Sequence, residues 1–185
     1  MKKVLVPAVL LAFSTAVTLA QESVPPKHAV YIMDSDVKTV LKGAPPAVDQ
    51  QLKVVDMGKY NLAVGIIHRG ATKPDAPATG ISHAQETETY IVTSGGGTLI
   101  TGGTILNGRP SPPESEVTKV LNGPSTSGRM EGYESREVGP GDIIIIPFGV
   151  PHGWLKITDH VDYLSVRPDP DHVLPAGYVH PALKK

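Results

Sequence analysis

The chain contains no cysteine, carries almost no net charge and has no long hydrophobic run. Without cysteine there can be no disulfide, no lipid-anchored cysteine and no thiolate metal ligand or nucleophile. The formal net charge is −1 with no basic cluster, which makes nucleic acid and anionic membranes poor candidate partners. The longest apolar run, residues 4–13, is too short for a lasting membrane anchor. Stability must therefore come from the hydrophobic core of a folded domain.

Residues 1–20 have the pattern of a secretory signal peptide. Lys2 and Lys3 precede the apolar run, and small residues lead to a plausible cleavage site after Ala20. A core helix is the alternative, and Pro7 argues against it. We expect a periplasmic or secreted protein of about 165 residues, with no membrane association after cleavage and the size of one domain.

Glycine and proline are spread through the chain, with 19 and 18 of 185 residues, which favours an all-β domain of many short strands. We expect an N-terminal arm and one short helix within residues 21–50, a β-barrel over residues 51–167 and a C-terminal arm over residues 168–185. Ser35 can cap the helix and Gly43 can end it, with apolar residues at helical spacing between them. The C-terminal arm can wrap its own barrel or that of a neighbour.

Strands are predicted at residues 52–56 and 60–69. In the second, Leu62, Val64, Ile66 and His68 fall on one face, which we expect to point inward. Residues 96–106 read as a strand broken by glycines, and residues 154–158 and 161–166 as a closing hairpin. Residues 107–135, with a predicted strand at 117–121, are either a lid over the barrel mouth or a plain surface insertion.

The stretch from Pro140 to Trp154 places a histidine on stiff backbone. A turn at Pro140 and Gly141 leads into four isoleucines, residues 143–146, which suit a strand buried on both sides. A second turn contains Pro147 and Gly149, and His152 opens the next strand.

A second stretch upstream, residues 80–95, has complementary chemistry. Because successive side chains of a strand alternate between faces, Glu88, Tyr90 and Val92 share one face, and Ile81 and His83 share another nearby. His83, Glu88 and His152 can therefore converge inside a barrel.

These two stretches resemble the two motifs of the cupin superfamily. The second motif, Pro-Gly-x5-Pro-x-Gly-x2-His-x3-Asn, is matched by Pro140, Gly141, Pro147, Gly149 and His152, with Lys156 in the place of Asn. The first, Gly-x5-His-x-His-x3-4-Glu-x6-Gly, is matched by His83, Glu88 and Gly95, which puts Ile81 where its first histidine belongs. In the other register His83 is the first histidine and Gln85 the second, but Glu88 then comes one residue early. The resemblance implies a single-domain jelly-roll β-barrel and a homodimer.

Two imidazoles and a carboxylate are donors that one divalent transition metal ion accepts, such as Mn, Fe, Co, Ni, Cu or Zn. We therefore expect His83, Glu88 and His152 to be metal ligands, with Glu88 also moving protons. Gln85 can replace the missing histidine as a weak oxygen ligand, or hydrogen-bond water. Glu86, in the same turn, is expected to be a solvated surface acid.

Three further residues are expected to line the cavity: His68, Tyr90 and Trp154. His68 is either a fourth ligand or substrate contact, or a satisfied core histidine. Tyr90 and Trp154 either fill the barrel or stack on a sugar ring or phenolic substrate. Lys156 lies near the site or in solvent, and no function is assigned to the remaining histidines, His28, His160, His172 and His180.

Three functional classes fit these residues. The first is an exported metal-dependent enzyme, an oxidoreductase of the dioxygenase type or an isomerase, acting on a small carboxylate, phenolic or sugar substrate, as the resemblance implies. The second is a small-molecule or sugar-binding barrel with a structural metal or none. The third is a structural or partner-binding barrel with a degenerate site. The missing first-motif histidine keeps the second class open.

Overall fold

The computed structural model describes residues 25–45 and 49–184, so the predicted signal peptide lies outside the described residues. None of the helices within those ranges has the length and apolar character needed to cross a membrane. One α-helix, α1, spans Asp34–Gly43. The strands are β1 (Gln50–Asp56), β2 (Asn61–Gly70), β3 (Thr79–His83), β4 (Glu88–Gly95), β5 (Gly97–Thr101), β6 (Thr104–Pro110), β7 (Ser125–Glu131), β8 (Glu134–Val138), β9 (Ile143–Ile146), β10 (His152–Lys156) and β11 (His160–Asp169).

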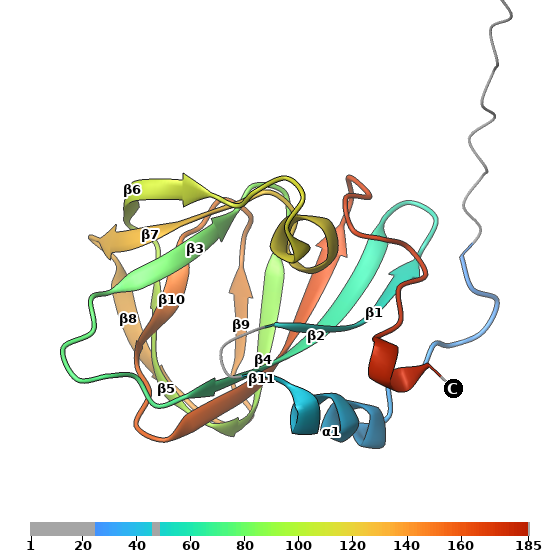
Figure 1. Ribbon diagram of the computed structural model, residues 1–185, viewed down its shortest axis with the longest axis horizontal. Helices are drawn as coiled ribbons and strands as arrows, with labels where there is room; N and C mark the ends of the chain where they lie inside the picture. The colour runs from blue at the N-terminus through green and yellow to red at the C-terminus, as the bar shows by residue number, and fades with distance from the viewer. Residues whose placement is uncertain (1–24, 46–48, 185) are drawn as a thin grey trace, which may run out of the picture.

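The strands form two antiparallel sheets packed face to face (Figure 1). One sheet has the order β1-β2-β11-β4-β9 and the other β6-β7-β3-β10-β5-β8. Without β1, β6 and β7, two four-stranded sheets remain, β2-β11-β4-β9 and β3-β10-β5-β8, which is the strand order of a jelly roll. The predicted all-β jelly roll with one short helix is confirmed.

The core lies between the two sheets because every second side chain of each strand points there. On β11 the buried positions alternate strictly, from Val161 through Tyr163 to Asp169. Val161 and Tyr163 pack with aromatic and branched side chains from both sheets and from the loop after β10: Ile67, Tyr90, Val92, Leu99, Ile146 and Ile157. The interior is therefore filled near the middle of the barrel.

Helix α1 packs on the outside of the five-stranded sheet. Val40 contacts a buried cluster with Leu52 of β1 and Ile66 of β2. The predicted cap at Ser35 is wrong, since the helix begins at Asp34 and the amide of Met33 donates to the carboxylate of Asp36. Helix α1 covers the outer face of β2, and the opposite sheet covers its inner face. Both faces of β2 therefore carry buried apolar side chains.

Three of the predicted strand features differ from the structure. Residues 117–121 form a single π-helical turn, Val117–Leu121. The predicted closing hairpin does not exist, because β10 and β11 belong to opposite sheets and the chain crosses between them. β9 is an edge strand, so Ile143 and Ile145 are 65% and 68% exposed rather than buried on both sides.

The C-terminal arm wraps its own barrel along β1. Leu174 is buried, the amide of Gly177 donates to the carbonyl of Val54, and the amide of His180 donates to that of Leu52. The arm ends in a short 3-10 helix, Pro181–Leu183, that packs near α1 (Figure 1). Asp169 anchors its start by accepting from the amides of Val173 and Leu174.

Candidate metal centre and its cavity

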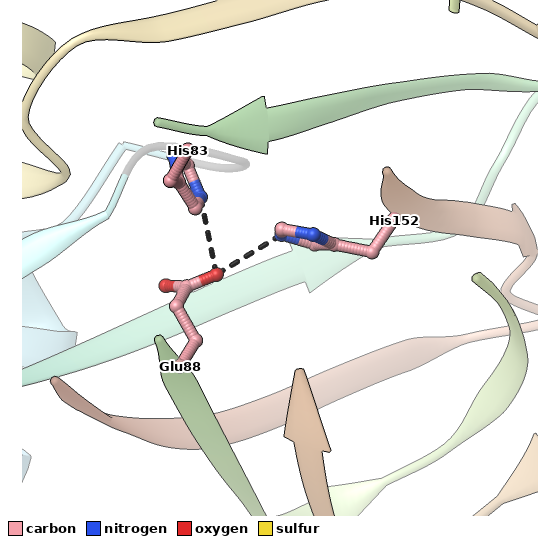
Figure 2. A group of neighbouring side chains, drawn as sticks. All are labelled: His83, Glu88 and His152. Atoms are coloured by element: carbon pink, nitrogen blue, oxygen red, sulfur yellow. Dashed lines mark hydrogen bonds and ion pairs between the residues drawn. The ribbon is translucent and has the colours of Figure 1, made fainter. Parts of the chain in front are cut away.

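Three strand ends bring His83, Glu88 and His152 together. His83 is the last residue of β3, Glu88 the first of β4 and His152 the first of β10. Strands β3 and β4 belong to opposite sheets, so the turn between them carries the chain across the interior. Figure 2 shows the two imidazoles pointing at the carboxylate from different strands.

Strands β3 and β10 approach unusually closely beside the site. A Cβ atom on Gly80 would lie 2.4 Å from the carbonyl oxygen of His152, and one on Gly153 would lie 2.2 Å from that of Thr79. Both distances are shorter than real contacts allow. The two glycines therefore permit the spacing of the two histidine-bearing strands.

The three side chains meet at one carboxylate oxygen. Oε2 of Glu88 lies 3.2 Å from Nε2 of His83 and 3.0 Å from Nε2 of His152. One ligand atom from each residue lies within 4.8 Å of the others, and all three residues are buried. The predicted convergence is present.

Hydrogen bonds on the far side of each ring leave both Nε2 atoms as acceptors. His152 Nδ1 lies 3.0 Å from the carbonyl oxygen of Val150, which can only accept, so this nitrogen carries the proton. His83 Nδ1 lies 2.8 Å from the hydroxyl of Ser125, which already donates to the carbonyl of Gly123 and therefore accepts from His83. Each Nε2 then presents a lone pair toward Glu88.

Glu88 is held as a carboxylate by its neighbours. Burial alone raises the pKa of this carboxyl, but the adjacent Arg167 guanidinium outweighs burial and holds the pKa well below its usual range. Nε of Arg167 donates to Oε1 at 2.7 Å, and the hydroxyl of Ser165 donates to the same oxygen at 2.9 Å. Oε2 accepts from the hydroxyl of Tyr90 at 3.0 Å.

This arrangement fits a metal ion. Two imidazole lone pairs and a carboxylate converge, and one cation between them would satisfy all three acceptors. Nε2 of His152 is buried and, among the described residues, has no well-aligned hydrogen-bond partner despite its 3.0 Å approach to Glu88. A nitrogen–nitrogen–oxygen set suits a divalent transition metal. The buried cluster can therefore hold one ion.

Further polar residues around the cluster were not identified from the sequence. Arg167 is completely buried and also pairs with Asp49, whose carboxylate lies 2.6 Å from its Nη2. The amide nitrogen of Asn122 lies 3.3 Å from Oε1 of Glu88 and 3.4 Å from Nε2 of His83. Asn122 and Ser125 come from the 107–135 segment. That segment therefore builds the site and is not a plain surface insertion.

Glu86 is a correction, because it is buried and not a solvated surface acid. Glu86 is 1% exposed, and within the described residues neither of its carboxyl oxygens has a hydrogen-bond partner. Burial first and the nearby Asp169 second raise the pKa of Glu86 to about 8.

The structure does not support Gln85 as a ligand. Its amide nitrogen donates to a carboxylate oxygen of Asp171 at 3.1 Å, outside the cluster. Ile81 stands in the place of the family's first histidine and lines the neighbouring cavity with carbon atoms. Three of the described residues, His83, Glu88 and His152, are therefore placed to coordinate an ion.

His68 does not line the cavity. Its face of β2 is the outer one, where its Nδ1 lies 2.6 Å from the carboxylate of Asp162 and its ring stacks on that of His160. Lys156 is exposed to solvent. Leu62, Val64, Ile66 and His68 do share one face of β2, as predicted. That face points outward, and the face that carries Ile67 points inward.

A cavity of about 820 Å³ adjoins the cluster. His152 and Tyr90 form its wall on the cluster side, and Trp154 and Ile81 also line it. The Trp154 ring packs against Tyr163 with 5.6 Å between centroids. The volume is within the range of small-molecule sites, roughly 300–1,000 Å³. Tyr90 and Trp154 therefore reach the position expected of them.

No protein-family model matches the sequence, and no curated protein matches it. Among solved structures, the chain is similar to BH2720 from Bacillus halodurans, with 18% sequence identity, coverage of 85% of this chain and 93% of that chain, and a TM-score of 0.47. It is similar to DMSP lyase DddQ from Ruegeria pomeroyi DSS-3, with 15% identity, coverage of 75% of this chain and 53% of that chain, and a TM-score of 0.41. It is also similar to polyketide cyclase RemF from Streptomyces resistomycificus, with 18% identity, coverage of 76% of this chain and 80% of that chain, and a TM-score of 0.39. The strand order itself defines the chain as a jelly roll, and within it lies a buried His-Glu-His cluster that can hold a metal ion.

Proposed function

We propose that the protein is an exported, metal-dependent enzyme, an oxidoreductase of the dioxygenase type or an isomerase, acting on a small organic substrate. The observation that carries this proposal is the convergence of His83, Glu88 and His152 at the wall of a cavity of about 820 Å³. A divalent ion bound there would supply Lewis acidity or a redox centre. Three protein ligands leave positions open for substrate.

The two histidines and Glu88 would hold the ion in a prearranged geometry. Ser125 fixes the ring of His83, and the carbonyl of Val150 fixes that of His152, so neither imidazole needs to reorient. Arg167 keeps Glu88 ionised and in place. Burial of all three residues excludes bulk water from the cluster.

Tyr90 is better suited than Glu88 to hold a proton at the site. Glu88 is committed to Arg167, Ser165 and Tyr90, and its depressed pKa makes it a weak base. Burial and the adjacent Glu88 raise the pKa of Tyr90 well above its ordinary value, so its hydroxyl stays protonated at neutral pH. That hydroxyl donates to Glu88 beside the cavity wall. We therefore assign Glu88 to metal binding and Tyr90 to proton positioning.

The test is elemental analysis of protein purified without added metal, combined with oxygen uptake and product analysis over carboxylate, phenolic and sugar substrates. We expect about one equivalent of a transition metal, lost in His83→Ala and in His152→Ala. His160→Ala is the matched control, because this imidazole contacts Ser94 and Asp159 and not the cluster. Equal metal loss in all three variants, or folded wild-type protein without metal, would overturn the assignment.

A second candidate is a non-catalytic barrel that binds a small molecule. The observation that favours it is Ile81, which replaces a histidine of the first cupin motif and leaves three protein ligands. Stoichiometric metal and saturable ligand binding without product would identify this function.

Export and pairing of two copies are also proposals, based on residues 1–20 and on the resemblance. Cell fractionation with N-terminal sequencing of the mature protein tests the first. Light scattering of the purified protein tests the second.

A further inference from the structure

The cavity beside His152 is lined by three arginines and by no lysine, aspartate or glutamate among the described residues. The arginines are Arg69, Arg109 and Arg129. This is a marked local excess in a chain whose formal net charge is −1. A concave site lined by charge of one sign concentrates ligands of the opposite sign.

Two of these arginines are brought to the same face by an irregularity in the 107–135 segment. Arg129 of β7 pairs with Leu106 of β6, and Ser127 pairs with Arg109. Leu106 and Arg109 are three residues apart, so in a regular strand they would point to opposite faces. The register shift between them, where Asn107 has a φ of +51°, places Arg109 on the same face as Arg129.

Arg69 approaches the cavity from the opposite sheet. Its Nε donates to the hydroxyl of Tyr163 at 2.8 Å, and its Nη2 lies 3.8 Å from the carboxylate of Asp49. These contacts hold the guanidinium beside Trp154 and Tyr163 at low conformational cost. The cavity thus has one fixed arginine on its inner wall and two at the β6–β7 wall.

The charges at the β6–β7 wall are incompletely neutralised. Arg129 lies 3.5 Å from Glu131 with both side chains largely exposed, a contact that solvent weakens. Arg109 has no carboxylate within 4.0 Å in the described part of the chain. An incoming anion can therefore engage these guanidinium groups without breaking a buried ion pair.

Apolar and aromatic side chains make up much of the remaining lining, beside the uncharged polar Thr72, Thr79, Asn107 and Ser127. Tyr90, Trp154, Ile81, Leu106 and Ile157 supply flat and branched surfaces between the arginines and His152. Such surfaces bury the hydrocarbon or aromatic body of a small molecule.

We propose that the cavity binds a small organic anion: an apolar or aromatic body packs on Trp154 and Tyr90, and a carboxylate or other oxyanion group is held by Arg109, Arg129 and Arg69. This inference rests on the proposed function in taking the cavity as the substrate site. It narrows the substrate class, because a neutral sugar can accept hydrogen bonds from the arginines but cannot neutralise their charge.

Trp154 provides the measurement, because it is the only tryptophan of the chain and lines the cavity. Its fluorescence is followed in metal-free, chelator-treated protein during titration with benzoate, phenyl phosphate and the neutral benzyl alcohol. We expect saturable changes with both anions and binding at least about tenfold weaker for benzyl alcohol. Benzoate affinity should fall as salt concentration rises.

The matched variants separate the cavity arginines from general surface charge. R109Q/R129Q removes two exposed side chains that the fold does not need, and should weaken benzoate binding by about tenfold or more. R136Q removes an exposed arginine of β8 outside the cavity and should leave the affinity unchanged. A tighter response to phenyl phosphate than to benzoate would identify a phosphorylated substrate, and the reverse a carboxylate.

Equal affinity for benzoate and benzyl alcohol, or unchanged affinity in R109Q/R129Q, would overturn the inference. Metal-free binding of benzoate by a protein that never acquires metal would instead overturn the proposed function and leave the anion site intact. The two proposals can therefore fail separately.

Discussion

Two buried carboxylates lie two residues apart, and their surroundings are opposite. Glu88 faces two imidazoles, a guanidinium and two hydroxyl groups, and its pKa is lowered. Glu86 faces Asp169 without a hydrogen-bond partner among the described residues, and its pKa is raised to about 8. Both are 1% exposed. Burial therefore does not decide the charge of a carboxyl group in this protein; the groups that meet it do.

The largest effect is expected from Glu88→Gln, which tests whether the charge of Glu88 is needed at the cluster. This substitution keeps the shape of the side chain and removes its charge. We expect metal affinity to fall by more than about 100-fold, since a ligand is lost and not only an outer partner. Inductively coupled plasma analysis after dialysis against a known free-metal concentration measures the change.

The matched control for Glu88→Gln is His68→Ala, which removes a histidine–carboxylate contact on the outer face of β2. Metal content should be unchanged, and the free energy of unfolding should shift by no more than about 0.5 kcal/mol. A comparable loss of metal in His68→Ala would contradict the ligand assignment.

Next in size is Arg167→Met, which leaves the buried Glu88 and the partly buried Asp49 without their shared cation. The free energy of unfolding of metal-free protein should fall by about 3 kcal/mol, because breaking a buried pair strands a charge. Metal affinity should fall by about tenfold, as for other outer partners of a ligand. Urea denaturation and metal titration provide the two readouts, and unchanged stability would show that Arg167 does not stabilise Glu88.

The smallest effect is expected from Glu86→Gln, and it depends on pH. In the unfolded chain Glu86 ionises near its ordinary pKa of 4.5, whereas the folded protein retains the proton to about 8. Within this window the folded state holds the extra proton, so the contribution of Glu86 to stability falls as pH rises and levels off above about 8. Glu86→Gln should remove this slope and raise the free energy of unfolding at pH 8 by about 1–3 kcal/mol.

The contribution of Glu88 has the opposite sign. Its folded-state pKa is depressed, so its stabilising effect is complete above the ordinary value of 4.5 and is lost as pH falls. The difference between wild-type protein and Glu86→Gln in urea titrations of metal-free protein between pH 5 and pH 9 isolates the Glu86 slope, since all other ionisable groups are common to both. An equal slope in wild type and Glu86→Gln would show that Glu86 is already ionised in the folded state.

The motif residues could be placed from the sequence because their spacing depends on local geometry. His83 and Glu88 lie at the two ends of one turn, and His152 follows a turn that Pro147 and Gly149 define. Turn chemistry and strand alternation act over a few residues, so they can be read without knowledge of the rest of the chain.

The remainder of the site depends on distant partners. Alternation on β11 places Arg167 on the same face as Tyr163, but nothing local indicates that Glu88, 79 residues earlier, neutralises it. Glu86 looks like an ordinary turn residue until the 107–135 segment and the C-terminal arm, through Gly123 and Asp169, close over it. Long-range packing, not propensity, determines both.

His68 and the isoleucine run of β9 were misplaced for a shared reason. Both strands carry apolar residues toward the outside, where α1 covers Ile66 and where β9 is left bare at the sheet edge. An apolar strand face predicts burial, but it does not say whether the opposite sheet or a helix outside the sheet buries it.

The glycines of the β3–β10 contact have a consequence for how such a site can change over time. The distance between the two imidazoles depends on the absence of a side chain at Gly80 and at Gly153. A methyl group at either position would push β3 and β10 apart, and with them His83 and His152, without changing the side chains of the cluster. The spacing of the two imidazoles can therefore change through the backbones of β3 and β10 while the three residues of the cluster stay the same.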